Sequence, residues 1–261
     1  GCSEPICDFC RDDGGWTPCY HRDVSDYIGT QTAPGHYIRE NAKNVCCLGD
    51  CATTVGKLEA VSAWIRRHLD HDPNCAADRY VPTAETLIGP SHKCFAGCTT
   101  FAHIFLALAR ELEVPIYYVE TIDLVSRNYM RSEDCRPGLL SGHAFAYFRD
   151  DDGTWRYFNP TQGQVAPLFF GYLWFEINEQ FHFYEILATG RDGNDLGYFS
   201  AADFEADLES RFCPGGSCRS SEACWSCPAS WFHDTICDCG CGNFDPHCGI
   251  DFGCYHSGCS H

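Results

Sequence analysis

The stretch GCTTFAHIFLALAR, which runs from Gly97 to Arg110, contains the pattern from which the fold and the function of the chain are predicted. Phe101, Phe105 and Leu108 recur at the spacing of one helix face, which predicts a buried helix that begins at about Cys98. Unpaired backbone N–H groups and the positive end of the helix dipole stabilise a thiolate at such a position. Gly97 also leaves room for a substrate backbone to approach. The position therefore suits a cysteine nucleophile.

A cysteine nucleophile needs a base and a group that orients that base. Residues 141–161 read as two strands joined by the tight turn DDDG. If the turn centres on its second and third aspartates, His143 lies across from about Pro160, one residue from Asn159. We therefore expect His143, as the base, and Asn159, as the orienting group, to meet at one end of a hairpin.

The chain resembles the transglutaminase-like superfamily between about residues 52 and 165. The resemblance lies in three signature blocks and two upstream blocks, namely residues 97–121, 142–144, 155–161, 58–69 and 83–88. It implies an α+β fold with a papain-like core, in which a helix that carries the nucleophile Cys98 packs on an antiparallel sheet that carries His143. The third catalytic member of the family is usually Asp, whereas here it is Asn159, as in papain-type enzymes. An amide still accepts the imidazole hydrogen bond and holds the ring's tautomer, without adding negative charge.

Two further histidines lie near the predicted nucleophile in the sequence. His92 precedes Cys98 by six residues, where papain-type enzymes, by resemblance, keep an oxyanion-hole side chain. His92 is therefore a candidate oxyanion-hole donor, and a loop histidine without a catalytic role is the alternative. His103 lies about 140° around the predicted helix from Cys98, which indicates a surface or packing residue.

The charge of the chain excludes some partners. It carries 36 acidic and 18 basic residues, with a formal net charge of −18. Such a surface repels nucleic acid and anionic membrane faces, and no apolar run approaches membrane-spanning length. We expect a protein or peptide substrate, no nucleic-acid partner and no membrane span. The oligomeric state leaves no mark on the sequence.

The chain contains 21 cysteines, a load typical of oxidising compartments. We therefore expect a secreted, extracellular or periplasmic protein. Ten disulfides would leave one thiol, and Cys98 is the position where a disulfide would abolish the predicted chemistry. The start Gly1–Ser3 resembles the end of a lipoprotein cleavage site, but a lipid on Cys2 would leave a second cysteine unpaired.

Cysteine density also suggests a division of the chain into a cysteine-rich N-terminal segment, a transglutaminase-like catalytic core and a cysteine-rich C-terminal segment. These parts cover residues 1–51, 52–212 and 213–261. Cys7 and Cys10 have the spacing of a redox or zinc pair, but a structural disulfide is the preferred interpretation because no strand precedes a helix there. The C-terminal segment also contains histidines, so zinc is its alternative to disulfides.

The sequence predicts no cofactor and no metal site in the core. The turns at residues 150–153 and 192–195 could attract calcium, but neither contains the full loop pattern with a distal bidentate acid. His68 and His71 lack partners at helical spacing that would complete a metal site, so we interpret them as solvated helix-end residues.

Together these features predict a secreted thiol enzyme that acts on amide bonds of proteins or peptides through a Cys98 thioester. Resolution by water would make it a protease, amidase or deamidase, and this hydrolysis is favoured. Resolution by a lysine amine would make it a protein-glutamine gamma-glutamyltransferase, which cross-links proteins. The alternative from another class is a non-catalytic binding module stapled by disulfides.

Overall fold

The computed structural model describes six parts of the chain, residues 9–12, 15–18, 24–46, 51–124, 142–177 and 180–212. The chain divides into two compact units. The first comprises residues 1–121, 143–167 and 186–200, and the second comprises residues 122–142, 168–185 and 201–261. The predicted C-terminal cysteine-rich segment, part of the N-terminal one and Cys7 of the pair Cys7 and Cys10 lie outside what is described. The three-part division therefore stays a prediction.

The first unit contains a group of helices and most of one sheet. Its helices are η1 (Val24–Tyr27), α1 (His36–Val45), α2 (Thr54–His68), α3 (Ala84–Ile88) and α4 (Cys98–Glu111). Its sheet has the order β8-β7-β6-β5-β11, formed by β5 (Ile116–Asp123), β6 (Gly142–Arg149), β7 (Trp155–Asn159), β8 (Gln164–Ala166) and the end of β11 (Gln180–Gly190). The short strands β3 (Asp70–His71) and β4 (Cys94–Phe95) pair in parallel, and β1 (Phe9–Asp12) and β2 (Gly15–Pro18) pair as a hairpin.

The second unit contains β9 (Leu168–Phe169), β10 (Tyr172–Ile177), the start of β11 and helix α6 (Ala201–Phe212). Strand β10 pairs antiparallel with β11 on one side and with β9 on the other. The described part of the chain thus has the mixed helices and antiparallel strands that the α+β prediction requires.

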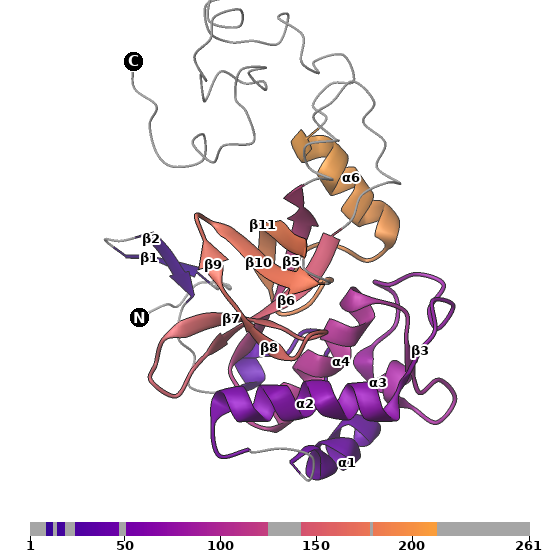
Figure 1. The fold of residues 1–261 in the computed structure, drawn as a ribbon. Coiled ribbons are helices and arrows are strands. Elements are labelled where there is room, and N and C mark those ends of the chain that lie inside the picture. Colours follow the sequence, from indigo (N-terminus) through magenta and orange to yellow (C-terminus); the bar gives the residue numbers. More distant parts are fainter. Residues whose placement is uncertain are drawn as a thin grey trace, which may run out of the picture. The chain divides into compact units, whose positions relative to one another are not determined.

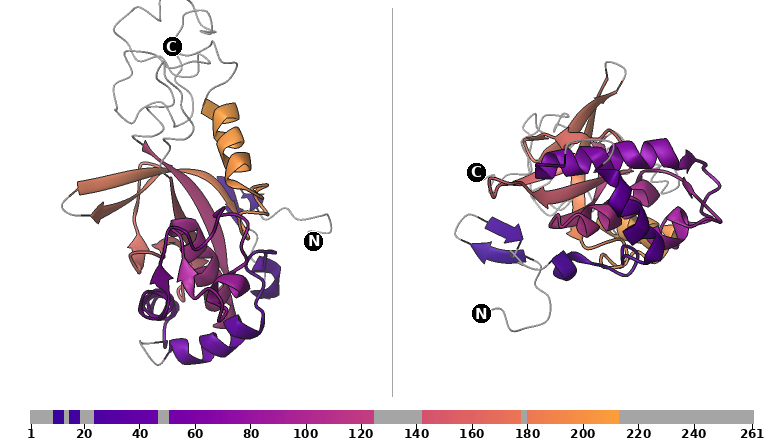
Figure 2. Two further views of the ribbon diagram at one scale, coloured as in Figure 1. Left: turned by 90° about the vertical axis from the view of Figure 1, so that its right-hand side faces the viewer. Right: turned by 90° about the horizontal axis from the view of Figure 1, so that it is seen from below.

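Helix α4 is the centre of the first unit, and its side chains from Thr99 to Arg110 are all buried. Figure 1 shows α4 between the helices α1–α3 and the strands β6–β8, and Figure 2 shows from another direction that the helices gather on one side of these strands. The Phe105 ring of α4 stacks on Phe158 of β7 with centroids 5.4 Å apart. The predicted start of the helix at Cys98 is confirmed, since apolar residues at helical spacing bury one another here.

The hairpin of β6 and β7 forms as predicted, but its register differs by one residue. Ala146 pairs with Phe158, which places His143 across from Thr161 instead of Pro160. The reason is the turn, where the backbone N–H of Asp150 bonds to Thr154 O at 2.8 Å and Gly153 adopts φ 83°. The left-handed glycine adds a residue to the loop, which a turn centred on two aspartates does not allow for.

The same turn holds the start of α2. Thr53 accepts a hydrogen bond from Gly56 N at 3.0 Å as the N-cap. The Asp151 carboxylate accepts bonds from Thr54 N at 3.0 Å and from Thr54 Oγ1 at 2.6 Å. This aspartate of the DDDG turn is therefore engaged by a helix N-terminus.

Two disulfides lie within the described residues. Cys46 bonds to Cys51, with Cα atoms 5.6 Å apart, and not to its neighbour Cys47. Cys75 and Cys94 bond to each other, with Cα atoms 5.9 Å apart, and so close the loop that contains α3.

None of the helices in the described ranges combines the length and the apolar character that a membrane span needs. The same residues contain no group of three or more His, Cys, Asp or Glu side chains that could hold a metal ion.

Candidate active site

Cys98 is the first residue of α4 and is half-buried, and it carries a thiol outside the two disulfides. Thr100 Oγ1 fixes the turn that leads into the helix, because it accepts bonds from Ala96 N at 2.9 Å and Gly97 N at 3.1 Å. A side chain at the third helical position that reaches back in this way is one half of a capping box. A Cβ added at Gly97 would meet nothing within 4 Å, so open space adjoins the thiol.

The thiol of Cys98 is hydrogen-bonded to the His143 imidazole and receives the backbone N–H of Ala144. Burial opposes ionisation of the thiol, but the bond to His143, the attraction of its charge and the Ala144 N–H lower the Cys98 pKa below its ordinary value of 9.0. Burial likewise disfavours the imidazolium, but the bonds to Cys98 and Asn159 raise the His143 pKa above 6.5. Opposite shifts of this kind favour a thiolate–imidazolium pair.

Asn159, at the end of β7, holds the far side of the imidazole. Its Oδ1 lies 2.9 Å from His143 Nε2 and also accepts bonds from Thr161 Oγ1 at 2.9 Å and Gln162 N at 3.3 Å. Asn159 is fully buried, so this geometry is fixed. Since Nε2 is directed at Asn159, Nδ1 is the ring atom that remains for Cys98. The structure thus brings together Cys98, His143 and Asn159 from α4, β6 and β7.

Sequence reasoning missed a buried acidic group beside these residues. Glu120 of β5 is 3% exposed, and its Oε2 accepts bonds from Tyr80 OH at 2.7 Å and from Tyr118 OH. Burial raises the Glu120 pKa, and the two tyrosine bonds offset this only in part. An acidic residue inside the apolar run IYYVETI was the signal in the sequence, but nothing there pointed to its partners.

The structure does not bring the other two histidines into this group. His92 is exposed in the turn after α3, with Nδ1 3.1 Å from Ser91 Oγ, and its oxyanion-hole role stays a prediction. His103 is fully buried in α4, so the packing interpretation is correct and the surface one is wrong. Its ring lies 5.4 Å from that of Tyr118. Burial and the nearby Arg110 lower the His103 pKa to about 3, which keeps the ring neutral.

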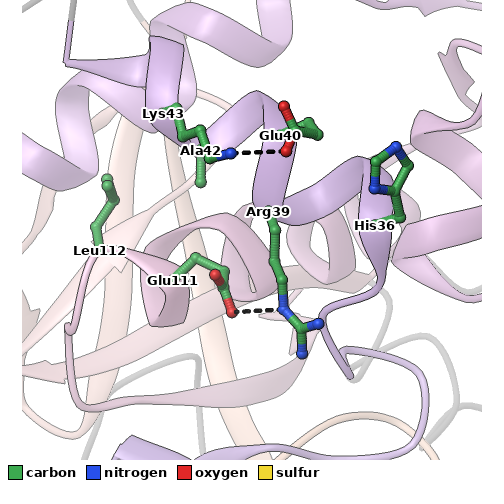
Figure 3. Close-up of a pocket in the computed structure, with 7 residues that line it drawn as sticks. All are labelled: His36, Arg39, Glu40, Ala42, Lys43, Glu111 and Leu112. Atoms are coloured by element: carbon green, nitrogen blue, oxygen red, sulfur yellow. Dashed lines mark hydrogen bonds and ion pairs between the residues drawn. The ribbon is translucent and has the colours of Figure 1, made fainter.

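A hollow of about 470 Å³ lies elsewhere on the first unit, between α1 and the C-terminal end of α4. Figure 3 shows that its charged side chains pair with one another, Lys43 with Glu40 at 2.6 Å and Arg39 with Glu111 at 3.9 Å. The hollow contains no nucleophile, so we do not assign the chemistry to it.

Residues 45–160 match the family model of the transglutaminase-like superfamily. This stretch, which is less than half of the chain, is similar to the transglutaminase-like superfamily. It contains Cys98, His143 and Asn159, and the domain family together with a thiol at a helix tip supports a cysteine-type enzyme.

Among solved structures, the chain is similar to one from Cytophaga hutchinsonii named "Putative Cysteine Protease". The two share 19% sequence identity with a TM-score of 0.41, and the match covers 67% of this chain and 50% of that one. The chain therefore matches half the length of that structure. A search of curated proteins finds no match.

Proposed function

We propose that this chain is a secreted thiol enzyme that cleaves amide bonds of proteins or peptides through a Cys98 thioester, with water as the main acyl acceptor. The observation that carries the proposal is the hydrogen-bonded series from Cys98 through His143 to Asn159 at the tip of a buried helix. A nucleophile, a base and an orienting group within hydrogen-bond reach are what this chemistry requires.

In the first half of the reaction, the Cys98 thiolate attacks the amide carbonyl carbon and forms the C–S bond. The negative charge moves to the carbonyl oxygen, where the backbone N–H groups at the start of α4 can receive it. When the C–N bond breaks, the His143 imidazolium gives its proton to the leaving amine, and a thioester remains. Asn159 Oδ1 holds the Nε2 proton of His143 throughout, so that Nδ1 carries out the transfer.

In the second half, the acyl acceptor attacks the thioester carbonyl and His143 takes its proton. The C–S bond then breaks and Cys98 leaves as a thiolate, while the proton taken from the acceptor stays on His143, which restores the starting thiolate–imidazolium pair. Water as acceptor releases an acid, whereas a primary amine forms a new amide. Both outcomes use the side chains of Cys98, His143 and Asn159, so a hydrolase and a transferase would have the same geometry at these residues.

The location of the chain is part of the proposal. The disulfides Cys46–Cys51 and Cys75–Cys94 are consistent with a compartment outside the reducing cytosol.

The test is to incubate the full chain with glutamine-containing peptides, with and without a primary amine, and to weigh the products by mass spectrometry. Peptide fragments or conversion of glutamine to glutamate support hydrolysis, and Cys98→Ala should abolish them. Amine adducts that dominate over acid would replace hydrolysis with the transglutaminase alternative. If wild type and Cys98→Ala give the same products, and Cys98 resists alkylation, the non-catalytic module is the correct function.

A further inference from the structure

We propose that Glu120 is a positioning residue for the Cys98–His143 pair, a buried carboxylate fixed by two tyrosines that supplies the negative charge that the neutral Asn159 does not. This inference rests on the proposed function, since it concerns the same thiol and imidazole. Glu120 acts through its charge and takes no part in the bond changes.

The hydrogen bonds around Glu120 fix one oxygen from two directions. Tyr80, from the loop before α3, and Tyr118, two residues earlier on β5, both donate their hydroxyl protons to Oε2. Burial and the neighbouring Glu120 charge raise the pKa of both tyrosines well above 10.0, so both remain neutral donors. A carboxylate that accepts two O–H groups is in the arrangement that favours its charged form.

The strand pairing places this carboxylate next to the reacting groups. Arg149 N bonds to Pro115 O at 3.2 Å and Thr121 Oγ1 bonds to His143 O at 2.7 Å, which together fix β5 antiparallel to β6. With that register Glu120 lies beside Ala144, the residue whose backbone N–H bonds to the Cys98 sulfur. Glu120 also shares a strand face with Tyr118, which contacts α4 through His103.

The charged and titratable groups that act on Glu120 come from the loop before α3, from α4 and from two strands of the sheet. They are Arg79 and Tyr80 from the loop, Cys98 from α4, Tyr118 from β5 and His143 from β6. The Glu120 charge opposes the thiolate and favours the imidazolium, so it raises the pKa of both Cys98 and His143. Arg79 faces the same groups with the opposite charge.

A purely structural role would satisfy the same hydrogen bonds, so the test must measure charge. We would follow the rate of Cys98 alkylation by iodoacetamide against pH, which reports both ionisations of the coupled pair and needs no substrate. Glu120→Gln keeps the size of the side chain and an oxygen that can accept the tyrosine bonds. The rate–pH profile has one inflection for each ionisation of the pair. In Glu120→Gln we expect both inflections to move to lower pH by about half a unit or more.

Two further variants make the result decisive. Glu111→Gln makes the same charge change about 20 Å along α4 from Cys98, beyond the screening length of physiological salt, and should leave both inflections in place. Arg79→Gln removes the opposing cation and should move both inflections to higher pH, which keeps the test open if Glu120→Gln does not fold.

The inference is overturned if folded Glu120→Gln, or Arg79→Gln in its place, keeps both inflections within about 0.2 pH units of wild type, because that is less than a neighbouring charge would cause. That failure differs from a failure of the proposed function. In the latter case wild-type Cys98 itself would titrate as an ordinary thiol, with one inflection near 9.

Discussion

At its N-terminal end, α4 presents a half-buried cysteine whose hydrogen-bond partners favour its charged form, next to open space beyond Gly97. At its C-terminal end, the same helix buries Arg110 to 3% exposure, where the guanidinium donates to Thr32 Oγ1, to Ile116 O at 2.9 Å and to Arg191 O at 2.7 Å. One end keeps a charge that a substrate can reach, and the other uses a charge to bind loops and strand together. The difference teaches that reactivity and stability are separable along this helix, so variants at its two ends should affect different measurements.

The largest expected effect is at the reactive end. His143→Ala removes the base and the bond that lowers the Cys98 pKa, so kcat/KM on the best peptide should fall by about 10³-fold or more. The free energy of unfolding should change little, because Asn159 Oδ1 keeps its bonds from Thr161 Oγ1 and Gln162 N when the imidazole is removed. A variant that retains a tenth of wild-type activity would contradict the assignment of the base.

His103, in the middle of α4, should make the folded chain less stable at acidic pH. His103 has a pKa of about 3 in the folded chain and 6.5 as its ordinary value, so the unfolded state alone gains its proton between these values. His103 therefore lowers the free energy of unfolding only below pH 6.5. The loss is about 1.4 kcal/mol per pH unit, or about 3 kcal/mol near pH 4.

His103→Leu should remove that part of the acid sensitivity, measured by urea unfolding at several pH values. The exposed His71→Leu is the matched control and should keep the wild-type slope. If the two variants have the same slope, His103 does not remain neutral in the folded chain.

A substitution at the C-terminal end of α4 should change the free energy of unfolding and leave activity unchanged. Arg110→Met leaves the acceptors on Thr32, Ile116 and Arg191 without their donor, which should lower the free energy of unfolding by about 3 kcal/mol. The control Arg39→Met removes an exposed arginine near the same end and should cost less than about 0.5 kcal/mol. A large fall in kcat/KM of folded Arg110→Met would contradict the separation of the two ends.

Substitutions of Asn159 should have a smaller effect on kcat/KM and should shift the pH–rate profile in a known direction. Asn159→Ala removes the acceptor that fixes the His143 ring, and kcat/KM should fall by about tenfold. Asn159→Asp keeps the acceptor and adds a charge, so activity should persist while the alkaline limit of the pH–rate profile moves upward. An alkaline limit that moves downward in Asn159→Asp would show that this side chain does not face the imidazolium.

The smallest effect is expected at Gly97. A Cβ there meets nothing in the unliganded structure, and the backbone φ of 177° is open to any residue, so Gly97→Ala should leave the melting temperature unchanged. If the substrate backbone approaches at this point, KM should rise by about threefold, the size expected when a methyl group displaces part of a contact. An unchanged KM would place the substrate elsewhere.

How much the sequence reveals also differs along the chain. The start of α4 at Cys98 was predictable because the helix buries a regular apolar stripe. The meeting of His143 with Asn159 was predictable because both belong to one hairpin. The register was missed by one residue because the left-handed Gly153 extends the turn.

The remaining features join segments that only the fold brings together. Glu120 receives Tyr80 from a loop 40 residues earlier, and Arg110 reaches Thr32 and Arg191 from opposite parts of the sequence. Cys75 pairs with Cys94 because a bridge depends on Cα separation, which spacing in the sequence does not give.

The central claim is that Cys98 is a thiolate activated by His143, and selective alkylation tests it most directly. The native chain would be treated briefly with limiting iodoacetamide at about pH 6, well below the ordinary cysteine pKa, and its peptides mapped by mass spectrometry. We predict one adduct, on Cys98, that forms at least tenfold faster than in His143→Ala. Equal rates in the two proteins, or Cys98 found bonded to another cysteine, would contradict the account.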